Sequence, residues 1–145
     1  MANIERNASV VWHGSMREGN GKMSTSSGAL KDVPYTWSAR FEETPGTNPE
    51  ELLAAAHAAC YSMALSGALV RKEYTVHSIQ TTATCVMEPK QGGGYGITTM
   101  RLVTRAKVDD VTPESFKEIA EATKAACPVS GALSALKIEL DAALE

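Results

Sequence analysis

Two cysteines and one histidine are the residues best suited to chemistry in this sequence. Cys60 lies within an alanine-rich, apolar stretch, and His57 precedes it by three positions, so a helix would place both on one face. Cys127 directly precedes Pro128, where one helix must end and a new helical turn can begin. A thiol in that position lies near unpaired backbone N–H groups, which lower its pKa. Two such thiols suggest redox chemistry or, together with His57, a metal site.

Other interpretations of these residues stay open at the level of sequence. A cysteine inside an apolar helix often serves as a small hydrophobic residue, and Cys60 and Cys127 would then be inert thiols of a non-catalytic stress or binding protein. A metal site lacks an obvious fourth ligand. Cys60 could instead be the nucleophile of a hydrolase or acyl carrier with His57 as base, although two residues on one helical turn are poorly aligned for proton transfer. Cys85 fits the interior of a strand and is predicted to be a core residue.

The stretch that positions Cys60 has the sequence pattern of a long helix. Asn48 can cap the first turn, Pro49 suits the first helical position, and Glu51 occupies the capping-box position. No Asp, Glu, Lys or Arg occurs from residue 52 to residue 70, and apolar residues fall on every face. This pattern predicts a helix that protein surrounds on all sides.

The remaining segments predict an α+β fold with antiparallel sheets around long central helices. Before the central helix we expect three strands, at residues 8–13, 22–26 and 35–41, with a hairpin turn at residues 19–21. After it we expect a hairpin of residues 75–87 and 95–108, a helix from Thr112-Pro113 to Cys127, a helical turn over 128–136 and a last strand over 137–140. No linker or repeat interrupts the order, which predicts one domain over residues 1–145.

The composition is that of a soluble globular protein. Of the 145 residues, 43% are hydrophobic and 21% are charged, and the formal net charge of −3 without a cluster of Lys or Arg argues against a nucleic-acid partner. The apolar stretch is long enough to span a membrane, but its alanines, His57, Ser62 and Ser66 argue against a membrane protein. Three cysteines without a C-x-x-C motif, and an N-terminus without a signal-peptide pattern, predict a cytoplasmic protein.

Two motifs of the sequence resemble those of a known family. Residues 46–65 (GTNPEELLAAAHAACYSMAL) and 124–130 (KAACPVS) are similar to motifs of the OsmC/Ohr family of organic hydroperoxide reductases, and most similar to the OsmC branch (osmotically inducible protein C). The resemblance extends over nearly the whole chain, because residues 24–28 (STSSG) and 37–42 (WSARFE) also match. It implies an OsmC-like domain that forms an intertwined homodimer with sites at the subunit interface.

By this resemblance the protein is a thiol-dependent peroxidase without metal or organic cofactor. Cys60 takes the place of the peroxidatic thiol, which attacks an organic hydroperoxide, releases the alcohol and becomes a sulfenic acid. Cys127 takes the place of the resolving thiol that condenses with it to a disulfide. The resemblance also implies recycling by a dithiol reductant of the dihydrolipoamide type. Leu, Met and Tyr side chains are expected to form an apolar pocket that favours organic hydroperoxides over hydrogen peroxide.

Two charged residues complete the site that the resemblance implies. Arg40 matches the active-site arginine of the OsmC branch, and Glu50 matches the glutamate that orients it. In the Ohr branch the arginine lies at the turn before the second strand, for which Arg17 is the weaker candidate here. Ten residues separate Glu50 from Cys60, about 15 Å along one straight helix, so Glu50 must come from a second subunit if it serves the thiol. We therefore expect an obligate dimer, with Cys60 and Cys127 from one chain and Glu50 from the other.

Overall fold

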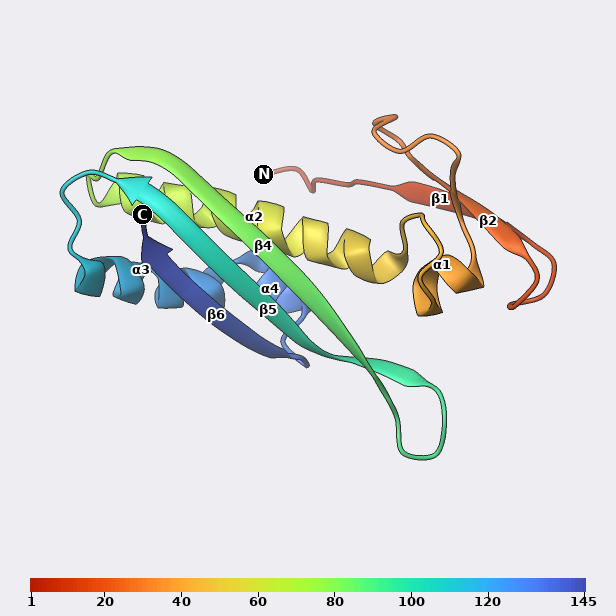
Figure 1. Ribbon diagram of the computed structural model, residues 1–145. Helices are drawn as coiled ribbons and strands as arrows, with labels where there is room; N and C mark the ends of the chain where they lie inside the picture. Colours follow the sequence, from red (N-terminus) through yellow and green to blue (C-terminus); the bar gives the residue numbers. More distant parts are fainter. The chain divides into compact units, whose positions relative to one another are not determined.

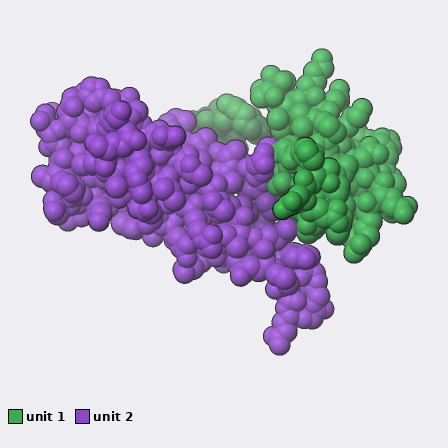
Figure 2. Space-filling view, viewed as in Figure 1, with its two compact units in different colours: residues 1–49 green, residues 50–145 purple.

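The computed structural model describes residues 1–145, which divide into two compact units. Unit 1 comprises residues 1–49 and unit 2 residues 50–145 (Figure 2), and each contains one three-stranded sheet. In chain order the elements are β1 (Ala8–His13), β2 (Asn20–Thr25), β3 (Val33–Tyr35), α1 (Trp37–Phe41), α2 (Pro49–Arg71), β4 (Val76–Pro89), β5 (Tyr95–Val108), α3 (Pro113–Ala126), α4 (Pro128–Ala132) and β6 (Lys137–Leu144) (Figure 1).

The sheet of unit 1 is the expected meander of three strands. β1 has the predicted bounds and pairs antiparallel with β2, which pairs antiparallel with the short strand β3. His13 lies opposite Asn20, and Trp12 lies opposite Gly21. The prediction that residues 19–21 form the hairpin turn is therefore wrong, because the last two of these residues belong to β2.

The turn between β1 and β2 covers residues 14–19 instead. Gly14 has a positive φ of 87°, a conformation that glycine adopts without strain. Gly21 is a glycine for a different reason, because the Tyr35 ring occupies the space into which a side chain at this position would point. Arg17 therefore lies inside the turn that precedes the second strand.

The segment 35–41, predicted to be the third strand, is mostly a short helix. β3 ends at Tyr35, and α1 runs from Trp37 to Phe41. Thr36 caps this helix, because its Oγ1 accepts a hydrogen bond of 3.2 Å from the Ala39 N–H. The rings of Trp37 and Phe41 lie 5.2 Å apart, as expected of residues four apart on a helix. These two aromatic residues share a face in a strand as well as in a helix, so the alternation alone does not distinguish the two structures.

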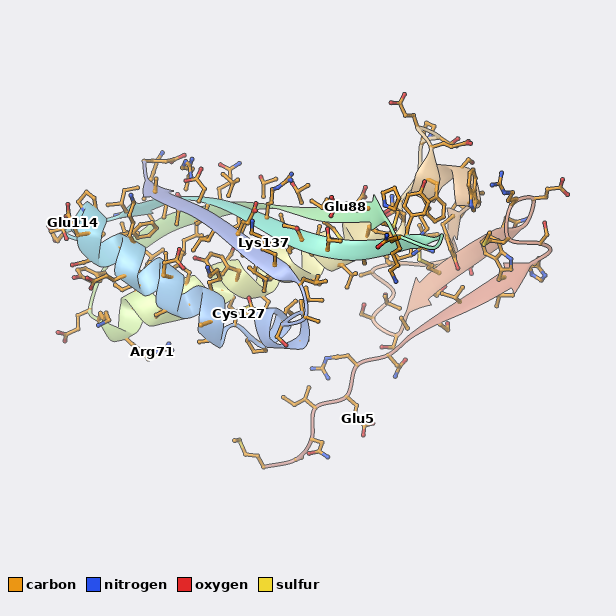
Figure 3. All side chains as sticks on the ribbon, turned by 90° about the horizontal axis from the view of Figure 1, so that it is seen from below. Glu5, Arg71, Glu88, Glu114, Cys127 and Lys137 are labelled. Atoms are coloured by element: carbon orange, nitrogen blue, oxygen red, sulfur yellow. The ribbon has the colours of Figure 1, made fainter.

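In unit 2, helices α2, α3 and α4 lie on one face of the sheet of β4, β5 and β6 (Figures 1 and 3). β4 pairs antiparallel with β5, as predicted, and three glycines with positive φ turn the chain at residues 92–94. The outward face of the sheet carries ion pairs between β5 and β6, among them Arg101–Glu139 and Arg105–Asp141. The inward face of β5 is buried and contributes to the core.

β6 lies parallel to β5, so the prediction that all strands are antiparallel is wrong for this pair. α3 and α4 connect the two strands, and such a helical crossover returns the chain to the same end of the sheet. β6 also continues to Leu144, beyond the expected end at residue 140, and pairs with β5 over its whole length. The fold class is α+β as predicted, with one antiparallel sheet and one mixed sheet.

α2 supplies one side of the core of unit 2. His57, Tyr61, Leu65 and Leu69 follow one another at intervals of four residues and are fully buried. The last three pack in one cluster with residues of β5 and α3 (Leu102, Ala106, Phe116, Ala120). The Tyr61 hydroxyl donates a hydrogen bond of 3.0 Å to the Ala120 carbonyl, which joins α2 to α3.

The opposite side of α2 is not covered within the chain. Met63 is 76% exposed and Val70 is 56% exposed. The prediction that protein surrounds this helix on all sides is therefore wrong for the single chain, because the core fully buries only the stripe through Tyr61 and covers its flanks in part. By length and composition α2 is the one helix that could cross a membrane, yet its buried stripe belongs to the core of unit 2.

Candidate active site

The structure brings two of the predicted site residues together. Cys60 lies in the middle of α2, and Cys127 lies between α3 and α4 (Figure 3). Their Sγ atoms are 3.2 Å apart. A disulfide bond is about 2.05 Å long, so a movement of roughly 1 Å would let the sulfurs bond. The pair can therefore pass between dithiol and disulfide without a large rearrangement.

The local sequence explains why Cys127 lies where it does. α3 begins at Pro113 with Thr112 as its cap, as predicted, and it must end before Pro128, which has no N–H to continue the helix. Pro128 instead becomes the first residue of α4. Cys127 is thus the C-cap of α3 and the N-cap of α4, so its side chain lies near the first N–H groups of α4.

The two thiols have different electrostatic surroundings. Burial by itself raises the pKa of Cys127, but donation from the Ser130 N–H, from the Cys60 thiol and from other groups at the start of α4 outweighs it, so the pKa is lowered. For Cys60, burial raises the pKa, and a hydrogen bond from the Val129 N–H compensates only in part. Within unit 2, a single negative charge on the pair is therefore better stabilised on Cys127 than on Cys60.

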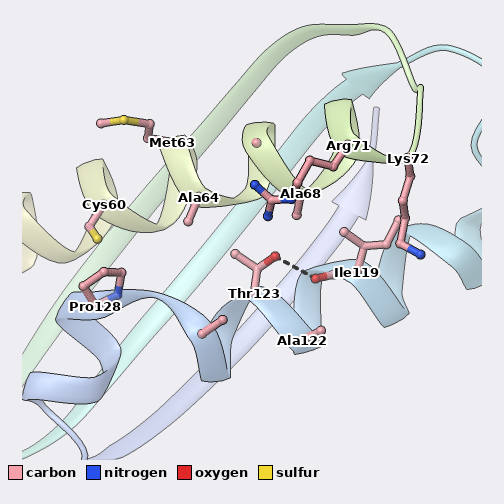
Figure 4. Close-up of a pocket in the computed structure, with 12 residues that line it drawn as sticks. Cys60, Met63, Ala64, Ala68, Arg71, Lys72, Ile119, Ala122, Thr123 and Pro128 are labelled. Atoms are coloured by element: carbon pink, nitrogen blue, oxygen red, sulfur yellow. Dashed lines mark hydrogen bonds between the residues drawn. The ribbon is translucent and has the colours of Figure 1, made fainter. Parts of the chain in front are cut away.

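Accessibility also distinguishes the two thiols. Cys127 is 1% exposed, whereas Cys60 is half-buried and lines a cavity of about 640 Å³ between α2 and α3 (Figure 4). A small molecule in this cavity would meet Cys60 first. Cys127 lies behind it, within bonding reach of Cys60 alone among the cysteines.

The cavity is apolar, but its walls differ from the expected ones. Met63, Ile119 and alanines of both helices line it, and Arg71 and Lys72 lie at the end away from Cys60 (Figure 4). No leucine or tyrosine lines it, although both types were expected. The reason is the direction of the side chains, since the tyrosine and the leucines that follow Cys60 in α2 face the core on the other side of the helix.

His57 lies on the core face of α2, and neither of its ring nitrogens bonds Cys60. Its Nε2 is 2.8 Å from Ser130 Oγ, and its Nδ1 is buried without a partner. Burial lowers the pKa of His57, which favours the neutral ring. His57 is thus not placed as a base for Cys60, and no group of three His, Cys, Asp or Glu residues that could hold a metal is present.

Glu50 lies too far along α2 to serve the thiols of its own chain. The helix is unbroken from Pro49 to Arg71, so Glu50 and Cys60 are about 15 Å apart along its axis. The carboxylate is buried and influences Cys85, whose pKa is raised mainly by burial and further by Glu50. Cys85 lies opposite Met100 in the sheet, half-buried and apart from the thiol pair.

Arg40 belongs to unit 1, and its approach to the thiols stays a prediction. It lies in the last turn of α1, with its guanidinium carbon 5.1 Å from the centre of the Phe41 ring. Together with Trp12 and other aromatic residues it lines a cavity of about 220 Å³. Arg17, the weaker candidate, stacks on the Trp37 ring at 4.6 Å. Unit 1 thus presents two guanidinium groups on one aromatic cluster.

Ser130 is the residue of the site that the sequence analysis missed. It belongs to the KAACPVS motif, where only the cysteine received a role. A signal was present, because a helix cap receives hydrogen bonds from the N–H groups two and three residues later, and Ser130 is three residues after Cys127. The sequence does not indicate the partner of the Ser130 hydroxyl, and the structure shows that it forms a hydrogen bond with His57.

Known proteins match the chain over most of its length. The family model described as OsmC-like protein matches residues 41–141. Peroxiredoxin OsmC of Escherichia coli (strain K12) is 43% identical over 138 residues, with 95% of each chain covered. Organic hydroperoxide resistance protein OhrB of Bacillus subtilis (strain 168) is 30% identical over 112 residues, which are 77% of this chain and 80% of that protein. A solved organic hydroperoxide resistance protein from Elizabethkingia anophelis shares the fold, with a TM-score of 0.79, 21% identity and full coverage of both chains.

Proposed function

We propose that this chain, which belongs to the family of OsmC-like proteins, reduces organic hydroperoxides to alcohols as a peroxiredoxin-like peroxidase. One observation carries the proposal: the Cys60 and Cys127 sulfurs lie 3.2 Å apart, and the more accessible sulfur lines an apolar cavity. Relatives named for peroxide reduction and for organic hydroperoxide resistance support the same chemistry.

Cys60 performs the first step, because it is the thiol that a substrate in the cavity can reach. Its thiolate attacks the terminal oxygen of R–O–O–H, so that an S–O bond forms and the O–O bond breaks. The alkoxide takes up a proton and leaves as the alcohol, and Cys60 becomes a sulfenic acid. The apolar walls near Cys60 favour the alkyl group of an organic hydroperoxide over the polar hydrogen peroxide.

Cys127 performs the second step, in which the enzyme becomes a disulfide. Its sulfur attacks the Cys60 sulfenic sulfur, an S–S bond forms, and the hydroxyl leaves as water. The lowered pKa of Cys127, caused by the donors at the start of α4 against the opposing effect of burial, favours this attack. A dithiol reductant of the dihydrolipoamide type then restores both thiols and leaves as its own disulfide.

The first step needs a cation that unit 2 does not place beside Cys60. Burial raises the pKa of this thiol, and no positive side chain is among the groups that lower it. A guanidinium near Cys60 would stabilise the thiolate and the departing alkoxide. Arg40 is our candidate for this group, oriented by Glu50.

We further propose that the working enzyme is an intertwined homodimer. Glu50 lies about 15 Å from Cys60 along the unbroken helix α2, so it can serve only the site of a second chain. The exposed Met63 and Val70 give α2 an apolar face that such a partner would cover. Each of the two sites would then combine Cys60 and Cys127 of one chain with Glu50 of the other.

A peroxide-consumption assay tests the proposed activity. The protein is mixed with cumene hydroperoxide and dihydrolipoamide, and the loss of peroxide is followed over time. Wild-type protein should consume many equivalents, and the Cys60→Ser variant should consume none, whereas Cys85→Ser serves as the matched control and should remain active. Full activity of the Cys60→Ser variant would end the proposal, and inert thiols in the wild type would favour a non-catalytic binding protein.

Mixed dimers test whether the site is shared between subunits. Cys60→Ser and Glu50→Ala chains are each expected to be nearly inactive on their own. Unfolding and refolding them together should restore activity, because a mixed dimer contains one complete site. If Glu50 served the Cys60 of its own chain, no mixed dimer would hold a complete site, and refolding together would restore nothing.

The cellular setting and the domain count belong to the same proposal. A cycle that consumes a dithiol fits a reducing compartment, and we therefore place the protein in the cytoplasm. We treat residues 1–145 as a single OsmC-like domain, because relatives match it over up to 95% of its length. Neither nucleic acid nor membrane takes part in the proposed reaction.

A further inference from the structure

A buried histidine and serine extend the thiol pair into the core. His57 is 0% exposed and Ser130 is 4% exposed, and His57 Nε2 lies 2.8 Å from Ser130 Oγ. Ser130 follows Cys127 by three residues at the start of α4, its hydroxyl is among the donors that lower the pKa of the Cys127 thiol, and the Cys127 sulfur lies 3.2 Å from that of Cys60. The four side chains therefore form a continuous row from the core to the cavity. The reaction proposed above uses the two thiols and leaves the other two residues without a role.

The hydrogen bond between His57 and Ser130 indicates which ring nitrogen of His57 carries the proton. Ser130 has a single hydroxyl proton, and when it donates this proton to Cys127 it can only accept from His57. Nε2 must then be the protonated nitrogen. The buried Nδ1 has no partner, so a proton there would be a buried donor left unsatisfied, which agrees with the same assignment.

We propose that His57 is a positioning residue that acts through Ser130: its Nε2–H holds the Ser130 hydroxyl as a donor to Cys127, so that Cys127 is ready to attack oxidised Cys60. This inference rests on the proposed function for its use in the cycle. The donors are aligned before the reaction begins, because His57 and Ser130 are both fixed by burial on α2 and α4.

Few other ionisable groups influence this row. Cys60 and Tyr61 of α2 are the titratable neighbours of Cys127, and burial raises the pKa of Tyr61, with smaller effects of Glu121 and Cys127. Tyr61 therefore stays protonated when the thiols ionise. Glu121 of α3 is paired with Lys124 and is not among the groups that shift the pKa of Cys127.

The pH dependence of Cys127 alkylation tests the inference directly. In a background of Cys60→Ser and Cys85→Ser, Cys127 is the only thiol, and the midpoint of its rate against pH reports its pKa. Ser130→Ala removes the donor and His57→Leu removes the group that orients it, so each should raise this midpoint and slow alkylation at pH 7 about 3- to 10-fold, as expected for one lost hydrogen bond. A purely structural role would change the plateau rate through access and leave the midpoint where it was.

Conservative variants separate the donor from the shape of the side chain. Ser130→Thr keeps the hydroxyl, and His57→Gln offers an amide N–H near the position of Nε2, so both should return the midpoint toward the parent value. His77→Gln removes an exposed histidine that pairs with Asp109 and should change nothing. Unchanged midpoints in folded Ser130→Ala and His57→Leu would overturn the inference.

A measurement on the wild type covers the case in which these variants do not fold. The ring nitrogen resonances of ¹⁵N-histidine-labelled protein report the tautomer, and we expect His57 to be neutral with its proton on Nε2 between pH 6 and pH 8. A proton on Nδ1 would overturn the inference. These measurements need no peroxide, so they test the inference even if the peroxidase assay fails. If the enzyme is active, His57→Leu should slow disulfide formation at pH 7 and leave the rate of the first oxidation of Cys60 unchanged.

Discussion

The two thiol regions of unit 2 lie in contact and yet offer opposite environments. Cys127, at the junction of α3 and α4, is buried and surrounded by hydrogen-bond donors, whereas Cys60, in the middle of α2, borders a cavity and lacks a positive neighbour. Negative charge is thus better stabilised on the sulfur of Cys127, whereas the sulfur of Cys60 is the one that a substrate can reach. For the proposed reaction, unit 2 supplies the hydrogen-bond donors that Cys127 needs, whereas the cation that Cys60 needs must come from outside unit 2.

The largest expected effect follows from removing the buried thiol. Cys127→Ser should abolish repeated turnover through the disulfide, because Cys127 is the thiol that lies within reach of the Cys60 sulfenic acid. Mass spectrometry after one equivalent of cumene hydroperoxide should show one added oxygen and no internal disulfide. A disulfide between Cys60 and Cys85 in this variant would contradict the statement that Cys60 has no second thiol within reach.

The missing cation provides the next largest effect. Arg40→Ala should lower the rate of Cys60 oxidation about 100-fold, as expected for loss of a charged group at a developing oxyanion. Arg17→Ala is the matched control, because Arg17 lies on the same aromatic cluster. This substitution should lower the rate of Cys60 oxidation only a few-fold. Stopped-flow measurement with a single equivalent of peroxide isolates this step. If Arg17→Ala slowed the oxidation of Cys60 more than Arg40→Ala, the role would belong to Arg17.

A smaller effect is expected where α2 and α3 are joined beside the thiols. Tyr61→Phe removes the hydrogen bond to the Ala120 carbonyl and should lower the free energy of unfolding by about 1 kcal/mol, measured in urea. Tyr74→Phe is the control, because the Tyr74 hydroxyl makes no such link and its loss should cost less than about 0.5 kcal/mol. Equal losses would mean that this link does not hold the thiol helices together.

The smallest effect is a dependence of stability on pH. Burial lowers the pKa of His57 below its ordinary value of 6.5, so that at mildly acidic pH the unfolded chain binds a proton that the folded chain does not. The stability contributed by neutral His57 is complete above pH 6.5 and is lost as the pH falls through its lowered value. Urea unfolding at pH 7.5 and pH 5.5 should therefore show a larger loss for wild type than for His57→Gln. The same loss in both proteins would contradict a buried neutral ring.

Local patterns predicted much of the fold and failed where two structures share a pattern. The cap and proline at the start of α2 and α3, and the alternation of β5, predicted these elements correctly. Trp37 and Phe41 fit a strand as well as a helix, and the Thr36 cap decided between them. The parallel pairing of β6 was missed because strand direction depends on the path of α3 and α4, which periodicity does not describe.

The sequence by itself determined the two thiols, the helix that carries Cys60 and the proline that sets Cys127 at a helix start, because these depend on residue types within a few positions. Tertiary structure alone brought the two sulfurs to 3.2 Å, placed His57 on Ser130 and turned α2 so that Cys60 borders a cavity. The physical reason is the separation along the chain: residues 67 positions apart meet only when burial of α2 and α3 against one sheet fixes both helices.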